Sequence, residues 1–205
     1  MKVATYNVNG VNGRLPRLLE WLDETKPDIV CLQEIKTTDK KCPARARRCR
    51  LRFHLARAAL ASWRRHPRQG LAPGLPGDDT DLQARQVEAR VKGLVVASVY
   101  LPNGNPQPGP KFDYKLAWFE RLTAHAKTLI DSGKPVVLAG DLNVVPERIY
   151  TFWVNDAAFR RDAGFRMDFL LLTPDLLPRL RGTGVDREHR GREKPSDHAP
   201  AWVEL

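Results

Sequence analysis

Four short apolar segments of this chain end in or begin with acidic, amide or imidazole side chains, and this pattern constrains the fold more than any other feature. The four segments are Thr5–Gly10, Ile29–Glu34, Val137–Asn143 and Ser196–Pro200. A carboxylate at the end of a buried strand is costly unless a metal, a cation or a hydrogen-bond partner meets it. We therefore expect these polar strand ends to meet at one mouth of a single folded unit.

The remaining pattern predicts strands that alternate with helices. Helical spacing of apolar residues predicts one helix around 15–22, which ends before Pro27, and another over 112–129, which ends before Gly133 and Pro135. Short apolar runs predict the strands 2–8, 28–33, 136–139, 167–172 and 199–203, and another within 91–101 that follows a turn at Lys92-Gly93. We interpret residues 1–205 as one domain of α/β or mixed α+β class.

One stretch of the chain does not fit this alternation. Residues 42–71 are rich in Arg and Ala, and the part from Cys42 to Gln69 contains no clear strand pattern, although 56–63 is compatible with a short helix. Nine Arg and two Lys, with no Asp or Glu, lie between Lys40 and Gly77. These eleven charges account for the whole net charge of +10, so the basic character is local. A basic stretch of this kind is either a footprint for nucleic acid or an unselected sequence.

The sequence gives no indication of a membrane or secreted protein. No apolar run approaches the length that spans a bilayer, and the chain enters its first strand almost directly, without a signal-peptide pattern. Cys31, Cys42 and Cys49 are odd in number and lack the spacing of a zinc site. We expect Cys31 to be a small buried residue and the compartment to be the reducing cytoplasm of a bacterium.

Three polar residues at strand ends are candidates for metal and water chemistry. Asp141 and Asn143 are two residues apart, so both face the same side as the chain leaves its strand, where an acid can take a proton from water and an amide can orient the nucleophile or a phosphate oxygen. Glu34 is a candidate ligand for a hard cation such as Mg²⁺. Taken singly, an Asx turn explains the first pair equally well, and a surface carboxylate explains Glu34.

Asp168 lies within an apolar strand pattern and needs a partner there. His198 is the candidate that we favour, because a carboxylate on one imidazole nitrogen favours the charged ring and leaves the other nitrogen for a phosphate. The alternatives are an ion pair with Arg166 or another arginine, or an exposed strand face. Asp197 adjoins His198 but points to the opposite face of an extended chain, so it serves a metal or the local structure; a surface turn is the alternative for this pair.

Three aromatic residues complete the candidate site. Tyr100 ends a strand, where its hydroxyl can donate to a phosphate, although packing is the commoner role of such a tyrosine. Phe152 and Trp153 can stack on a base or line an apolar pocket for a sugar. For two adjacent aromatic residues, we expect at least one to pack in the core.

The order of these residues along the chain resembles the exonuclease III family of apurinic/apyrimidinic endonucleases, within the endonuclease/exonuclease/phosphatase superfamily. The resemblance rests on Leu-Gln-Glu ending at Glu34, Gly-Asp-x-Asn at 140–143 and Ser-Asp-His-Ala-Pro at 196–200, together with Asn7, Tyr100 and Asp168. It covers residues 1–41 and about 75–205. It implies a four-layer sandwich in which two β-sheets pack face to face with helices outside.

The resemblance also implies roles for single residues. Glu34 would hold Mg²⁺ or Mn²⁺ within a metal network, and Asp141 would activate or orient the attacking water. Tyr100 and Asn143 would position the phosphate, Asp168 would orient His198, and His198 would stabilise the phosphate charge. The network that the resemblance implies comprises Asn7, Glu34, Asp141, Asn143, Asp197 and His198, and Phe152 with Trp153 would receive a sugar that has lost its base.

Two departures from the family pattern accompany this resemblance. Residues 42–71 stand in place of a Gly-rich apolar strand, and their composition is what an out-of-frame reading of a GC-rich gene gives. Our hypothesis is a local frameshift that returns to register near Leu75. The chain also runs from Asn143 to Tyr150 where the family has several dozen more residues, so we expect an internal deletion near 144–149 that removes DNA contacts.

The function that this resemblance implies is a metal-dependent DNA repair phosphodiesterase. It would cut double-stranded DNA 5′ to abasic sites and act on 3′ ends as an exonuclease or phosphatase, and we expect a nucleoid-associated monomer. The alternative is a catalytically impaired relative that binds nucleic acid through its basic segment, and a weaker one is a phosphatase of small esters or lipid head groups.

Overall fold

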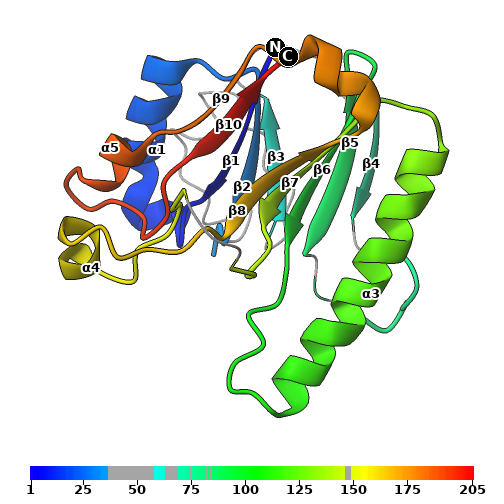
Figure 1. Ribbon diagram of the computed structural model, residues 1–205, viewed down its shortest axis with the longest axis horizontal. Helices are drawn as coiled ribbons and strands as arrows, with labels where there is room; N and C mark the ends of the chain where they lie inside the picture. The colour runs from blue at the N-terminus through cyan, green and yellow to red at the C-terminus, as the bar shows by residue number, and fades with distance from the viewer. Residues whose placement is uncertain (37–57, 63–68, 74, 82, 84, 146–148) are drawn as a thin grey trace.

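Two five-stranded sheets form the centre of the molecule (Figure 1). The computed structural model describes residues 1–36, 58–62, 69–73, 75–81, 83, 85–145 and 149–205. Sheet A has the order β3-β2-β1-β10-β9, with β3 (Ala58–Ser62), β2 (Ile29–Gln33), β1 (Lys2–Asn7), β10 (Ala201–Glu204) and β9 (Gly182–Val185). Sheet B has the order β4-β5-β6-β7-β8, with β4 (Gln69–Pro73), β5 (Gln86–Val91), β6 (Leu94–Tyr100), β7 (Val136–Asp141) and β8 (Asp168–Leu172).

Alternating side chains on each strand serve two separate cores, as the two-residue period of a strand requires. In β1, Val3 packs between the two sheets, whereas Ala4 and Tyr6 point to the outer face of sheet A. In β7, Val137 packs between the sheets and Leu138 points to the outer face of sheet B. This double burial explains why the central strands are continuous apolar runs in the sequence.

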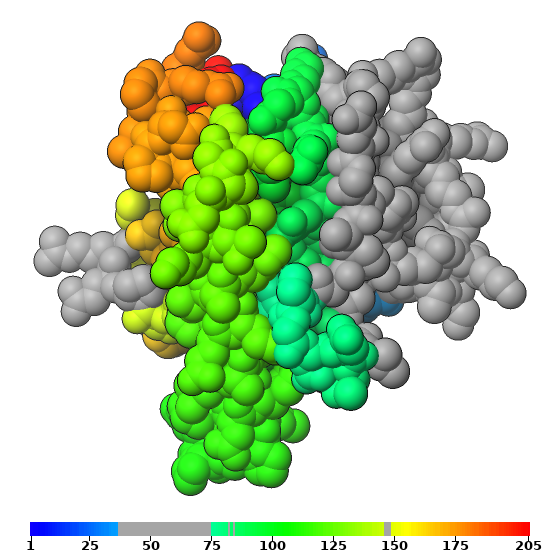
Figure 2. Space-filling model, turned by 90° about the vertical axis from the view of Figure 1, so that its right-hand side faces the viewer, coloured from blue at the N-terminus to red at the C-terminus, as the bar shows by residue number. Residues whose placement is uncertain are grey.

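Helices cover both outer faces of the two sheets. α1 (Val11–Thr25) packs on sheet A through Leu18 and Leu22, and α3 (Pro110–Asp131) packs on sheet B through Trp118 and Leu122. α3 crosses the outer face of sheet B, and its N-terminal end projects beyond the strands (Figures 1 and 2). Three short helices complete the described chain: α4 (Asp156–Arg160), η2 (Pro174–Arg179) and α5 (Arg187–Arg190). The predicted four-layer sandwich is confirmed.

The predicted turn at Lys92-Gly93 is present and joins β5 to β6. Both turn residues have positive φ, 51° for Lys92 and 81° for Gly93, which matches the two-residue hairpin turn that follows the natural twist of strands. The apolar pattern of the sequence does not predict β5 as a separate strand.

The expectation for residues 56–63 is wrong, because residues 58–62 form strand β3 and not a helix. The backbone of β3 pairs antiparallel with β2, with residue 60 opposite Cys31. Residues 69–73 form a second strand, β4, on the edge of sheet B. Pairing with a neighbouring strand outweighs the helical preference of alanine here, because strand formation depends on its partners more than on the residue type. The rest of the basic stretch, 42–57 and 63–68, lies outside the described residues.

The functional ends of the strands lie on one side of the sandwich. β1 and β2 are parallel, as are β6 and β7, so each pair ends at the same edge of its sheet. β8 runs antiparallel to β7 and begins at Asp168, directly opposite Asp141, and β10 runs antiparallel to β1. The segment before β10 therefore reaches the same end. Among the described residues, no helix is long and apolar enough to cross a membrane.

Candidate active site

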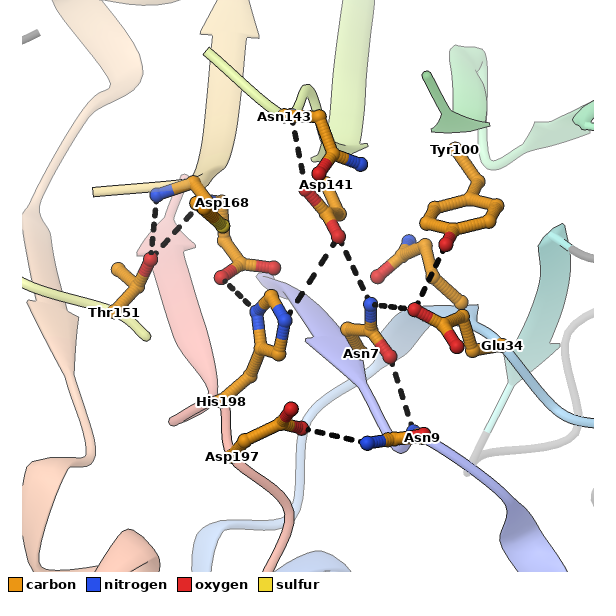
Figure 3. Close-up of polar contacts among 12 residues, drawn as sticks. Asn7, Asn9, Glu34, Tyr100, Asp141, Asn143, Thr151, Asp168, Asp197 and His198 are labelled. Carbon is orange, nitrogen blue, oxygen red and sulfur yellow. Dashed lines mark hydrogen bonds and ion pairs between the residues drawn. The ribbon is translucent and has the colours of Figure 1, made fainter. Parts of the chain in front are cut away.

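The polar strand ends predicted to converge do so across the two sheets (Figure 3). Asn7 and Glu34 come from the ends of β1 and β2 in sheet A, and Tyr100 and Asp141 come from the ends of β6 and β7 in sheet B. Beneath them, the buried amide of Gln33 accepts from the hydroxyl of Thr5 at 3.2 Å and donates to that of Ser98 at 3.4 Å. This polar link joins the sheets directly under the site.

Asn7 connects the acidic groups of the two sheets. Its Nδ2 donates to Oε1 of Glu34 at 3.1 Å and to Oδ2 of Asp141 at 2.9 Å. The hydroxyl of Tyr100 donates to the same Glu34 oxygen at 2.8 Å. The pKa of Tyr100 is raised by burial and by the adjacent Glu34 charge, so the phenol stays a hydrogen-bond donor at any physiological pH. One amide thus makes hydrogen bonds to two carboxylates that belong to different sheets.

Asp168, His198 and Asp141 form a second line of contacts. Nδ1 of His198 lies 2.7 Å from Oδ2 of Asp168, so the predicted contact between these residues is present. The other ring nitrogen, Nε2, lies 3.8 Å from Oδ2 of Asp141. All three side chains are almost completely buried. Such a line fixes the orientation of the imidazole and directs Nε2 towards the space beside Asp141.

Charge coupling shifts the pKa values of two of these groups. Burial alone would lower the pKa of His198, but the charges of Asp168 and Asp141 outweigh it and raise the value to about 9. Burial raises the pKa of Asp141 to about 6, although the charge of His198 opposes the shift. At pH 7 to 8 the site therefore holds a protonated imidazole beside an ionised carboxylate, which suits a donor to phosphate and an acceptor for a water proton.

The backbone at the strand ends bends sharply to aim these side chains. Glu34, Asn9 and Asn143 have positive φ values of 50°, 43° and 48°, a conformation that non-glycine residues seldom adopt. The turn after Glu34 is held by the N–H of Gly10, which donates to the Glu34 carbonyl at 2.8 Å. Unusual backbone of this kind is concentrated at functional sites in proteins.

Two predicted residues lie at the border of the site. Asp197 accepts from Nδ2 of Asn9 at 3.0 Å, on the side away from Asp168, as expected for a residue that alternates with His198. The side-chain amide of Asn143 contacts the loop after β6: its Nδ2 donates to the Leu101 carbonyl at 2.9 Å. The backbone N–H of Asn143 donates to Oδ1 of Asp141 at 2.9 Å, so the Asx turn weighed as an alternative is also present.

The two predicted aromatic residues have different environments. Phe152 lies against the imidazole of His198, with 4.8 Å between ring centroids. Trp153 is 0% exposed and packs against Phe159, so its assignment to the sugar-binding wall is wrong for this structure. Adjacent residues of an extended chain point in opposite directions, which sends the two rings to different places.

Phe165 extends the aromatic surface at the border of the site and is not among the residues predicted from the sequence. Its ring stacks on Phe152 with 6.5 Å between centroids and is 47% exposed. Lys36, which contacts Glu34, and Thr151, which contacts Asp168, are not predicted either. No motif marks these residues in the sequence, because they reach the site through tertiary contacts between distant segments.

The oxygen ligands of the site fit a hard divalent cation in their chemistry. Two carboxylates, Glu34 and Asp141, accept from the same Asn7 amide, and Mg²⁺ in proteins is held by one or two carboxylates and several waters. The ammonium of Lys36 lies 2.5 Å from Oε2 of Glu34 and 2.6 Å from Oδ1 of Asn9. A positively charged group therefore occupies a position beside these two oxygens. Within the described ranges, no group of three His, Cys, Asp or Glu residues is arranged as a complete metal site.

Comparison with known proteins supports the same family. Residues 4–198 match the model of the Endonuclease/Exonuclease/phosphatase family. Exodeoxyribonuclease III of Haemophilus influenzae is 24% identical over 267 aligned positions, which cover the whole of both chains. That alignment is longer than the 205 residues of this chain, so it includes positions where this chain has no residue.

Two solved structures have the same fold as this chain. An AP endonuclease from Archaeoglobus fulgidus is 30% identical, with a TM-score of 0.90 over 100% of this chain and 99% of the other. The 3′ phosphatase NExo from Neisseria, bound to a product DNA hairpin, is also 30% identical, with a TM-score of 0.92 and the same coverage. The chain therefore belongs to the endonuclease/exonuclease/phosphatase family and, within it, to the exonuclease III family of apurinic/apyrimidinic endonucleases.

Proposed function

We propose that this protein is a divalent-metal-dependent phosphodiesterase of double-stranded DNA that cuts 5′ to abasic sites and removes groups from 3′ ends. The observation that carries the proposal is the line of contacts from Asp168 through His198 to Asp141, joined by Asn7 to Glu34. The names of the relatives support DNA as the substrate. A monomer in the bacterial cytoplasm, associated with the nucleoid, accords with this proposal.

Each side chain of the site has a separate role in the proposed hydrolysis. Asp141 is the acceptor for a proton of the attacking water, because its carboxylate is ionised at pH 7 to 8 and lies at the centre of the site. The protonated His198, held by Asp168, donates from Nε2 to a non-bridging phosphate oxygen and stabilises the charge that develops there. Tyr100 and Asn143 border the phosphate position.

Glu34 and Asn7 would hold Mg²⁺ or Mn²⁺, with Asp141 as a neighbour in the same network. When bound, such an ion neutralises negative charge on the phosphate and on the leaving oxygen. Asp197, through Asn9, would support this network from its border.

The exposed ring of Phe165, stacked on Phe152, would form the apolar wall that receives a sugar without its base. A normal nucleotide carries a base into this space, whereas an abasic nucleotide does not, so the wall would favour the damaged strand. The projecting end of α3 lies beside the same mouth, because Lys115 of α3 donates to the Asn143 carbonyl at 2.8 Å. This helix end would contact the DNA backbone next to the lesion.

Incision of a labelled duplex that carries one tetrahydrofuran abasic analogue tests the proposal. We expect cutting 5′ to the analogue with Mg²⁺, no cutting with EDTA, and a loss of about a thousandfold or more for Asp141→Asn, the scale of removing an essential acid-base group. Salt-sensitive DNA binding without metal-dependent cutting would instead support the non-catalytic alternative. Turnover of a small phosphate ester in preference to DNA would support the third candidate.

A further inference from the structure

Thr151 lies outside the line of reacting groups but makes hydrogen bonds to Asp168 and to Ala199, the residue that follows His198. Its hydroxyl oxygen accepts from the backbone N–H of Met167 at 3.0 Å and from that of Asp168 at 3.1 Å (Figure 3). Its carbonyl accepts from the N–H of Ala199 at 2.7 Å, one residue after His198. Thr151 itself is 1% exposed.

The position of β8 explains why Asp168 needs such a contact. In the part of the chain that the structure describes, β8 is the edge strand of sheet B, and no further strand of this sheet lies on its outer side to accept its N–H groups. Asp168 begins this strand, where pairing with β7 ends opposite Asp141. A buried N–H group without an acceptor is costly. The hydroxyl of Thr151 accepts from the buried N–H of Asp168 and from the partly buried N–H of Met167.

A pocket adjoins the start of β8. A cavity of about 220 Å³ lies between the edges of the two sheets, and its lining includes Thr151, Asp168, Leu170, Gly184 and Trp202. Oδ1 of Asp168 is buried and has no hydrogen-bond partner among the described residues. The Asp168 side chain is buried beside this pocket, so its direction depends on the hydrogen bonds that its backbone and carboxylate make.

We propose that Thr151 is a positioning residue for the nuclease site, which fixes Asp168 and, through it, the imidazole of His198. This inference rests on the proposed function. A shift of about 1 Å in an orienting group is enough to reduce turnover by about a hundredfold. The hydroxyl acts only through Asp168 and does not touch the phosphate, so its loss would reduce kcat and leave KM for DNA nearly unchanged.

The test compares Thr151→Val with Thr151→Ser and with a matched control at the other end of β8. Thr151→Val keeps the shape and removes the acceptor, whereas Thr151→Ser keeps the acceptor. Thr173 provides the control: it is buried, follows β8 at the end distant from the site, and its hydroxyl accepts from the N–H of Val136 at 3.0 Å. Thr173→Val therefore removes the same kind of hydrogen bond without touching Asp168.

For incision of the abasic duplex, we expect kcat to fall about ten- to a hundredfold in Thr151→Val and by less than about twofold in Thr151→Ser and Thr173→Val. Urea unfolding provides the correction for stability. If Thr151→Val does not fold, Thr151→Cys, whose sulfur is a weak acceptor, takes its place with a smaller loss in the same direction. Equal kcat losses in the Thr151 and Thr173 valine variants, or equal losses in valine and serine, would overturn the proposal.

A second measurement separates this inference from the nuclease function. The ring N–H that His198 donates to Asp168 in a buried site gives a low-field proton resonance, which NMR detects without any turnover. We expect the resonance in the wild type, Thr151→Ser and Thr173→Val, and its loss in Thr151→Val. If the wild type does not cut DNA, the proposed function fails and the NMR result alone decides the role of Thr151; an unchanged resonance in Thr151→Val refutes it.

Discussion

Oδ2 of Asp168 lies 2.7 Å from Nδ1 of His198, in a site where both side chains are excluded from water. The carboxylate therefore does more than orient the ring, because it keeps the imidazole charged far above its usual range. A group with a raised folded pKa is fully charged below its ordinary value and loses its charge only as the pH rises through the folded value, here about 9.

Asp168→Asn is expected to move the alkaline limb of kcat to lower pH. The amide keeps the shape but removes the nearest negative charge, so only the charges of Asp141 and Asp197 still oppose the effect of burial, and the pKa of His198 falls below about 9. The measurement is kcat for the abasic duplex between pH 6 and about 10, a range that brackets the ordinary and the raised value. Asp175→Asn, in the exposed η2 helix, is the control. If the alkaline limb of kcat in Asp168→Asn stays near pH 9, Asp168 is not the group that raises the pKa of His198.

Lys36→Gln is expected to tighten the binding of a divalent cation. The Lys36 ammonium lies 2.5 Å from Glu34, where it competes with a metal for the same oxygen. Its side chain is 55% exposed, so solvent screening limits the effect to about 1 kcal/mol, or roughly fivefold in the dissociation constant. Titration with Mn²⁺ followed by electron paramagnetic resonance measures this constant directly.

Lys92→Gln, in the turn between β5 and β6 at the opposite end of sheet B, removes the same charge away from the site and is expected to have no effect on Mn²⁺ binding. Weaker Mn²⁺ binding in Lys36→Gln would show that the lysine supports the metal site and does not compete with it.

Phe165→Ala is expected to reduce discrimination in favour of abasic DNA. The exposed ring stacked on Phe152 is the surface that we assign to the baseless sugar, and the loss of one aromatic contact costs about 1–3 kcal/mol in comparable nucleic-acid sites. The ratio of kcat/KM for incision at the analogue to that for removal of a normal 3′ nucleotide measures the effect. Leu171→Ala, an exposed apolar residue of β8, is the control, and an unchanged ratio in Phe165→Ala would exclude this wall.

His189 is expected to make the fold less stable at acidic pH. The ring is 2% exposed and packs edge-on against Tyr6, and burial and the charge of Arg192 lower its pKa, against the opposing charges of Glu20, Glu24 and Asp186. A lowered pKa means that the unfolded chain binds the proton more readily, so stability is present above the ordinary value of about 6.5 and falls as the pH drops below it.

Urea unfolding between pH 8 and about 5, a range that spans the titration of free histidine, measures this dependence. His189→Phe removes the titrating group, so we expect the free energy of unfolding to fall less between pH 8 and about 5 than in the wild type. His125, which faces Glu88 on the outer side of sheet B, provides a comparison through His125→Gln. A profile that keeps its slope in His189→Phe would assign the acid sensitivity to other groups.

The strand ends of the site could be predicted from the sequence, because an acid or amide at the end of a buried strand requires a polar partner or a metal. Asn7, Glu34 and Asp141 follow such runs, and the structure brings them together. The same logic identified Asp168 and its partner, since a carboxylate in an apolar strand requires one.

The errors arose where a segment depends on its neighbours. Residues 58–62 form a strand only because β2 offers an edge to pair with. β9 was missed because Gly182–Val185 carries little strand preference; a Cβ at Gly184 would lie 2.6 Å from the Trp202 indole, so glycine is required for packing. Trp153 was assigned to the site although the alternation of side chains sends it to the core.

The hydrogen bonds of Asn7 to Glu34 and Asp141 have a consequence for how activity and folding depend on each other. The two carboxylates belong to different sheets, so neither half of the sandwich contains a working site by itself. A molecule whose sheets have begun to separate keeps most of its strands and helices but no longer holds its reacting groups at bonding distance. Catalytic activity therefore depends on close contact between the two sheets. During denaturation, we expect activity to be lost before the secondary structure is lost.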